Sequence, residues 1–182
     1  VREARVNNTS GDIVLSRISN GVEASTLSGD VSVTDSAGRI SLAVISGQIE
    51  ATNIRTIEAG DDFRVVSTSG DIELENVRHA RVVVNTTSGM ITMTGKLAPR
   101  GGYELNTFSG DVVLNIPQDS AFQINAKAPQ GGITTDFAIK STNEAEAANL
   151  LERGILSGSY GRGDWANLSI QSFSGTVRLQ KR

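Results

Sequence analysis

The fold is decided by the stretch Ser10-Gly11-Asp12-Ile13-Val14-Leu15. It joins a Ser-Gly-Asp turn to an apolar alternation of period two, which is typical of a strand with one buried face. Glycine tolerates positive φ angles there, and Ser and Asp side chains bond turn amides. Related copies begin at Ser28-Gly29-Asp30, Ser46-Gly47-Gln48, Ser69-Gly70-Asp71, Ser88-Gly89-Met90, Ser109-Gly110-Asp111, Gln130-Gly131-Gly132 and Ser174-Gly175-Thr176.

A second kind of strand lies between these copies and lacks the Ser-Gly turn, for example Val22-Glu23-Ala24 and Ile40-Ser41-Leu42. We call the Ser-Gly strands front strands and the others back strands. Stacked copies can bury the apolar faces, at roughly 1.5–3 kcal/mol per buried Ile, Leu or Val. The sequence therefore predicts an all-β protein, a parallel β-solenoid of the β-helix or β-roll kind, with two strands and about 18–21 residues per coil.

The spacing between the two kinds of strand is asymmetric. From a back strand to the next front strand it is nine residues, as in 22–31, 40–49 and 63–72, whereas from front to back it varies. The back strand before Ile133 fits best as Phe122-x-Ile124, with imperfect spacing. We therefore expect a uniform Ser-Gly edge and an opposite insertion edge, which often is the binding side of a repeat protein. The insertions cover roughly 52–61, 94–102, 115–121 and 135–166.

Apolar residues also recur three places beyond many strands. We expect them to turn inward where the chain rounds a corner. They are Ile18, Leu27, Ile45, Ile54, Val77, Phe108 and Phe173.

The whole chain, 1–182, is expected to form a single solenoid domain. Its largest insertion, 137–166, interrupts the repeat, and Asn143 with Glu146 resembles a capping box. The pattern predicts a short helix near 144–153, which would cover an open end of the solenoid.

Composition excludes several classes of function. The formal net charge of -3 does not favour nucleic acid or an anionic membrane as a partner. There are no cysteines, so disulfides and thiolate metal sites are excluded. The chain holds no apolar run long enough for a transmembrane helix, so we expect no direct membrane insertion. It begins with Val1 and shows no signal peptide, and we expect a leader or anchor to lie outside this segment.

The recurrent Ser-Gly-Asp-(Ile/Val)-x-(Leu/Val) copies and the closing segment 168–179 resemble a bacterial family of adhesin-like proteins, the DUF4097 type, related to the head-GIN adhesins. The resemblance spans nearly the whole chain. It implies a β-helical fold and an extracytoplasmic, envelope-associated setting. The family supplies no catalytic residues to carry over.

Four aspartates occupy one position of the Ser-Gly turn. They suggest a calcium ladder, but such ladders need carboxylates at nearly every coil, and Gln48, Met90, Gly132 and Thr176 interrupt this one. We interpret the aspartates as turn-capping residues and expect no metal and no cofactor. They are Asp12, Asp30, Asp71 and Asp111.

No catalytic group is recognisable in the sequence. The chain has one histidine, His79, and four lysines, and no coil collects the acids and the base that a polysaccharide lyase needs. His79 is expected to be a solvated residue in a connection, and the protein is expected not to be an enzyme.

The Gly-rich part of the last insertion holds the candidate binding residues. Arg162-Gly163-Asp164 is an integrin-type tripeptide, although its other role is a plain loop. Tyr160 and Trp165 could stack on sugar rings or fill the solenoid end. Because loops on a rigid scaffold commonly carry recognition, we expect a ligand near Tyr160, Arg162, Asp164 and Trp165.

The sequence thus favours a non-enzymatic, extracytoplasmic binding module whose partner is an unknown surface protein or glycan. The alternative is a structural spacer or self-assembling unit that associates through its solenoid ends. A carbohydrate-active enzyme ranks last.

Overall fold

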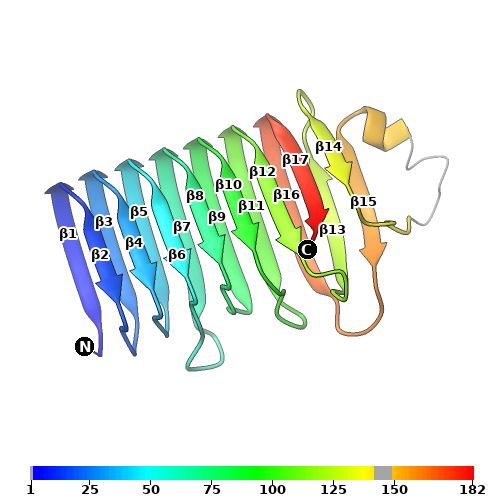
Figure 1. Cartoon of the computed structure of the whole chain (residues 1–182). Helices are drawn as coiled ribbons and strands as arrows, with labels where there is room; N and C mark the ends of the chain where they lie inside the picture. Colours follow the sequence, from blue (N-terminus) through cyan, green and yellow to red (C-terminus); the bar gives the residue numbers. More distant parts are fainter. Residues whose placement is uncertain (1, 142–148) are drawn as a thin grey trace.

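The front and back strands lie in two different sheets that enclose the core between them (Figure 1). The computed structural model describes residues 2–141 and 149–182. Neighbouring strands are parallel, except that β13 pairs antiparallel with β15. In spatial order the back sheet consists of β1 (Ala4–Ser10), β3 (Val22–Ser28), β5 (Ile40–Ser46), β7 (Asp62–Ser69), β9 (Arg81–Ser88), β11 (Gly102–Ser109), β16 (Ala166–Ser174), β13 (Phe122–Lys127) and β15 (Ile155–Tyr160). The front sheet consists of β14 (Gly132–Thr135), β17 (Thr176–Lys181), β12 (Val112–Ile116), β10 (Ile91–Thr94), β8 (Ile72–Glu75), β6 (Ile49–Thr52), β4 (Val31–Thr34) and β2 (Ile13–Ser16). The predicted parallel β-solenoid is confirmed.

The core is built from columns of inward side chains that run along the solenoid axis. In β8, Ile72 and Leu74 are 1% and 0% exposed, whereas Glu73 between them faces solvent. Leu74 pairs with Ala51 of the preceding coil and with Met93 of the following coil. The predicted alternation and its register are therefore correct.

The Ser-Gly edge requires glycine because successive coils meet there backbone to backbone. Gly70 has a φ of +132°, and a Cβ built on it would lie 2.0 Å from the carbonyl oxygen of Gly47. Gly89 repeats this contact against Gly70, at 2.2 Å. The glycine thus serves packing between coils as well as the turn within each coil.

The last strand pair of the sequence does not lie at the end of the stack. β16 lies between β11 and β13, and β17 lies between β12 and β14 (Figure 1). After β12 the chain leaves one coil position open, builds the terminal coil, and returns to fill the gap. The repeat pattern locates each strand pair but does not determine this stacking order.

The back strand before Ile133 is shifted by two residues from the expected unit. Ile124, not Phe122, pairs with Leu168 of β16, so it occupies the first inward position of the unit. Ile124 precedes Ile133 by nine residues, and the nine-residue spacing therefore holds here too. Phe122 lies two residues earlier in β13, where it is fully buried and pairs with Ala166.

The expectation that apolar residues turn inward beyond the strands is right at one edge and wrong at the other. At the insertion edge Ile18, Ile54 and Val77 are 5%, 0% and 2% exposed. At the Ser-Gly edge the back strands continue straight to the turn, so the preceding residue, such as Thr26, takes the inward position. The exposed residues there are Leu27, Ile45, Phe108 and Phe173, of which the two Phe rings stack with centroids 5.0 Å apart.

The described residues between β14 and β16, 136–141 and 149–165, close the end of the solenoid. β15 pairs with β13 on one side, and Ser159 of β15 bridges to Lys140 on the other. Phe137 is 3% exposed and packs edge-on against Phe122 and Tyr160, with centroids 5.2 and 4.8 Å away. An aromatic cluster thus fills the end of the core.

The described helical residues, 149–152, lie at the Ser-Gly edge and not at the insertion edge (Figure 1). The carbonyl of Gly154 accepts a hydrogen bond of 2.7 Å from the amide of Ala128, which follows β13 at that edge. β15 must start there to run antiparallel to β13. The predicted helix, 144–153, extends into 142–148, which lie outside the described residues. Within the described part of the chain, no helix is long and apolar enough to cross a membrane.

His79 is completely buried, so the expectation of a solvated histidine is wrong. Its Nε2 donates a hydrogen bond of 2.8 Å to the carbonyl of Gly38, and its ring lies 5.7 Å from that of Phe63. Nδ1 is buried without a hydrogen-bond partner in the described structure. Burial lowers the pKa of His79, and the hydrogen bond to Gly38 opposes that shift.

Acid is expected to destabilise the fold through His79. Since the pKa is lower in the folded state, the unfolded chain takes up the proton first as pH falls below about 6.5. The contribution to the free energy of unfolding is complete above that pH and is lost as pH falls toward the folded pKa. Urea unfolding between about pH 7.5 and 5.5 should show this loss as a slope in the free energy of unfolding against pH. His79→Gln keeps a donor for Gly38 and should flatten the slope; an unchanged slope would assign it to other groups.

Candidate ligand-binding edge

Seven connections lead into back strands at one edge of the solenoid, at the bottom of Figure 1, and four of them fall within the predicted insertions. These four are 53–61, 95–101, 117–121 and 161–165. The strands are parallel, so the starting ends of the back strands fall on the same edge. Ion pairs link neighbouring loops: Arg100 to Asp164 at 2.9 Å and Lys96 to Asp119 at 3.3 Å. Each exposed pair stabilises by only about 0–1 kcal/mol, but together they join three loops into one surface.

The four predicted binding residues have different surroundings. Tyr160 belongs to β15 and packs in the terminal aromatic cluster, with its hydroxyl donating to the carbonyl of Gln118 at 3.3 Å. Trp165 is 38% exposed in the loop 161–165. The side chain of Arg162 is exposed and forms no ion pair with any described residue. The structure therefore leaves Arg162 and Trp165 accessible, while Tyr160 serves the core.

Asp164 is engaged within the protein. Both Nε and Nη2 of Arg100 lie 2.9 Å from its Oδ1. Arg162, two residues earlier in the tripeptide, does not share this pairing. A ligand that needs a free Asp164 carboxylate would first have to displace Arg100.

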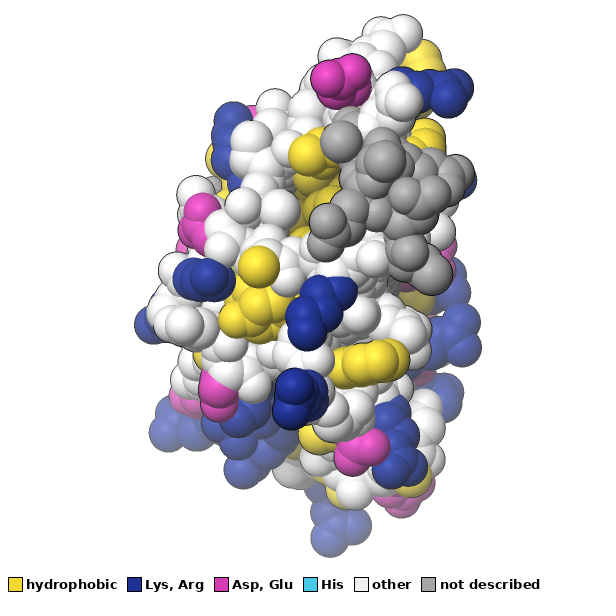
Figure 2. Space-filling view, turned by 90° about the vertical axis from the view of Figure 1, so that its right-hand side faces the viewer, with side chains coloured by type: hydrophobic (Ala, Val, Ile, Leu, Met, Phe, Trp, Pro, Cys, Tyr) yellow, Lys and Arg dark blue, Asp and Glu magenta, His cyan; other side chains and the backbone are white. Residues whose placement is uncertain are grey.

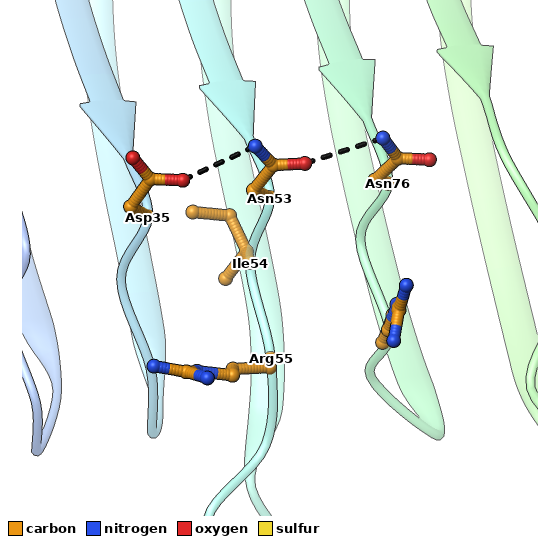
Figure 3. A pocket seen from close by; sticks show the side chains of 6 residues that line it. Asp35, Asn53, Ile54, Arg55 and Asn76 are labelled. Carbon is orange, nitrogen blue, oxygen red and sulfur yellow. Dashed lines mark hydrogen bonds between the residues drawn. The ribbon is translucent and has the colours of Figure 1, made fainter.

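A recess at the same edge was missed by the sequence reasoning (Figure 3). Asn53 Nδ2 donates to Asp35 Oδ1 at 3.1 Å, and Asn76 Nδ2 donates to Asn53 Oδ1 at 3.2 Å. These three residues have φ angles of 49°, 57° and 53° and turn the chain out of β4, β6 and β8. Two residues further on, Arg55 and Arg78 line the recess. The signal was present as the repeated triplets 53–55, Asn-Ile-Arg, and 76–78, Asn-Val-Arg.

The terminal face presents a different chemistry (Figure 2). Hydrophobic side chains lie there among Lys and Arg side chains. Lys181 Nζ lies 5.5 Å from the ring centroid of Phe137 and 6.0 Å from that of Tyr160. This geometry is that of cation–π contacts, which stabilise the aromatic cluster.

The aspartates of the Ser-Gly turn bind amides, although not those of their own turn. Asp30 Oδ1 accepts from the amide of Gln48 at 2.8 Å, and Asp71 Oδ1 accepts from the amide of Met90 at 2.8 Å. Each carboxylate thus bonds the equivalent position of the next coil. Asp111 also pairs with Arg178, at 2.9 Å. The aspartates therefore hold coils together.

Calcium is expected to leave stability unchanged, because these carboxylates are directed to amides. Millimolar CaCl₂ should not raise the melting temperature of the wild type. Asp30→Ala should cost about 0.5–1.5 kcal/mol, since the exposed amide of Gln48 exchanges the carboxylate for water. Thermal scans with CaCl₂ and with EGTA check both points. A calcium-dependent rise that Asp30→Ala abolishes would restore the calcium ladder.

The family comparison agrees with this architecture. A family model described as Toastrack DUF4097 matches residues 1–180. No curated protein and no solved structure matches the chain. The matched range takes in all the coils and the insertions between them.

Proposed function

The chain belongs to the Toastrack DUF4097 family, whose solenoid fold suggests a binding or structural module, and we propose that it is a non-enzymatic, adhesin-like binding module of the cell envelope. The proposal includes an extracytoplasmic location and a surface protein or glycan as partner. It places recognition at the insertion edge.

One observation carries the proposal: loops from separate coils are gathered at one edge and joined by the pairs Arg100–Asp164 and Lys96–Asp119. The same edge exposes Arg162 and Trp165. A rigid stack thereby presents a surface whose residues can vary without disturbing the core. Tryptophan and arginine are among the residue types enriched at the positions that contribute most to binding at protein interfaces.

Catalysis is disfavoured by how the carboxylates of this edge are used. Asp62 pairs with Arg39 at 2.9 Å, and Asp61 accepts hydrogen bonds from the amides of Ile57 and Glu58. These amides lower the pKa of Asp61, which keeps it ionised and unsuited to act as a general acid. The recess of Figure 3 is lined by a single carboxylate, Asp35. General acid–base hydrolysis of a glycoside commonly uses two.

The test is binding of the purified protein to a panel of glycans, peptidoglycan and envelope proteins. Replacing 158–164 by a linker would remove part of β15 and Tyr160, so point variants are the sharper tool. Arg162→Gln combined with Trp165→Ala should weaken a panel ligand at least about tenfold, a loss of about 1.4 kcal/mol. Arg64→Gln, on the outer face of β7, is the charge-matched control. A ligand that binds all variants equally would place recognition elsewhere.

A structural role is the second candidate, and the first coil favours it. β1 and β2 each have one hydrogen-bonded neighbour, so both sheets end there in an unpaired strand. Exposed strand edges are sites of chain-to-chain pairing. Sedimentation over a wide concentration range distinguishes the two roles: end-to-end dimers or filaments support the spacer, and a monomer at all concentrations supports the binding module.

A further inference from the structure

We propose that the recess beside Arg55 and Arg78 binds an acidic sugar unit of a glycan. The acid group binds the two guanidinium groups, and the sugar hydroxyls form hydrogen bonds with Asp35, Asn53 and Asn76. This deepens the proposed function and rests on it, because it names a ligand class for the insertion edge. The acid group is a carboxylate or a sulfate or phosphate ester, which guanidinium groups bind alike through paired hydrogen bonds.

The repeat places the same two side chains in the recess twice. Ile54 and Val77 are 0% and 2% exposed, so the residues on either side of each turn away from the core. The amide of Arg78 donates to the carbonyl of Ile54 at 2.8 Å, which holds the two Asn-aliphatic-Arg triplets side by side. Figure 3 shows Arg55 reaching across the recess toward the coil of Asp35. Two adjacent coils thus supply a matched pair of amides and guanidinium groups.

The charges of the two arginines are unbalanced. Neither Arg55 nor Arg78 forms an ion pair or a side-chain hydrogen bond within 2–141 and 149–182, and both are exposed. The two arginines lie in the connections of neighbouring coils, and such coils are about 4.8 Å apart. A bound anion would neutralise these uncompensated charges. The nearby Lys96 is already paired with Asp119, so it does not compete with the two arginines for an anion in the recess.

The acceptors of the recess favour a ligand that also carries hydroxyl groups. Asn76 Oδ1 ends the side-chain ladder and accepts no hydrogen bond from a described residue, and the same holds for Asp35 Oδ2. Inorganic sulfate has no donor for such acceptors, phosphate has only one or two hydroxyl groups at neutral pH, and Asp35 would repel either anion. An acidic sugar has both groups: its acid can lie near the arginines and its hydroxyls can donate to Asp35 and Asn76.

The size of the recess agrees with a small saccharide. Its volume is about 420 Å³, within the range of roughly 300–1,000 Å³ found for small-molecule sites. The recess is open to solvent, so binding is expected to weaken as salt rises.

The test is calorimetric titration of the full chain with tetragalacturonic acid, a sulfated maltotetraose, neutral maltotetraose and inorganic phosphate. We expect saturable binding of at least one acidic tetrasaccharide and none of the neutral one. Arg55→Gln or Arg78→Gln should each weaken it about ten- to a hundredfold. Arg64→Gln, with the same charge change on the back sheet, should bind as the wild type does. Asn76→Ala should weaken binding of the acidic tetrasaccharide.

Each other outcome has a definite meaning. The proposal is overturned if Arg64→Gln loses as much affinity as Arg55→Gln and Arg78→Gln do. It is also overturned if neither acidic tetrasaccharide binds. Phosphate binding as tightly as the saccharides overturns its sugar part. If the acidic saccharides fail but the ligand panel yields a ligand sensitive to Arg162→Gln and Trp165→Ala, this inference falls and the proposed function stands. Circular dichroism and melting temperatures confirm that the variants fold.

Discussion

Gly70→Ala is expected to cost about 3–5 kcal/mol of stability, or to prevent folding altogether. The added Cβ would lie 2.0 Å from the carbonyl oxygen of Gly47 and 2.7 Å from its carbonyl carbon. The backbone of the preceding coil, which contains Gly47, cannot move away without breaking the strand pairing on both sides of the turn. The φ of +132° adds strain that an alanine cannot relieve. Urea unfolding followed by circular dichroism measures the loss.

The variant Gly11→Ala separates the steric clash between coils from the strain of a positive φ. Gly11 occupies the same turn with a φ of +103°, but the nearest atom to its added Cβ, Nδ2 of Asn8, is 3.5 Å away. Its cost should therefore stay near the strain of a positive φ, about 1–2 kcal/mol. A Gly11→Ala loss as large as that of Gly70→Ala would show that turn strain, not contact between coils, fixes the glycine. The comparison remains decisive if Gly70→Ala does not fold, because Gly11→Ala must then fold.

Much of the fold could be predicted because a solenoid repeats local information. A period of two reveals the buried face of each strand, and the constant step of nine residues aligns each back strand with the following front strand. These rules place Ile49, Ile72 and Ile91 in one column, as the pairing confirms. The number of residues between successive strands also predicted which edge carries most insertions.

The stacking order could not be predicted, because it depends on contacts far apart in the sequence. β16 fits between β11 and β13 through pairs such as Leu105 with Ile170 and Ala126 with Ile170. Each partner strand offers the same apolar alternation, so the pattern is satisfied by several orders. The antiparallel β15 contains Ser157-Gly158, but the apolar alternation that follows Ser-Gly in the repeat is missing. The burial of His79 is similar: its partner, Gly38, is 41 residues away and contributes only a carbonyl.

The candidate site was predictable to the level of the edge, but not of its chemistry. An exposed loop was expected over 158–165, but 158–160 belong to β15. The pairing of Asp164 with Arg100 depends on the contact between two insertions. The recess of Arg55 and Arg78 depends on a turn of positive φ that Asn tolerates. Its repeated triplet looked like part of a variable insertion, because the segment after Arg55 is longer than the segment after Arg78.

Leu74→Ala is expected to cost about 2–5 kcal/mol, whereas Glu73→Ala should cost little. Leu74 is fully buried and lies between Ala51 and Met93, and Ala51 is already too small to fill a cavity beside it. Glu73 faces solvent directly opposite Glu50, so its removal relieves repulsion between like charges. Urea midpoints of both variants measure the difference. Equal losses would contradict the assignment of faces in β8, and with it the alternation on which the whole stack depends.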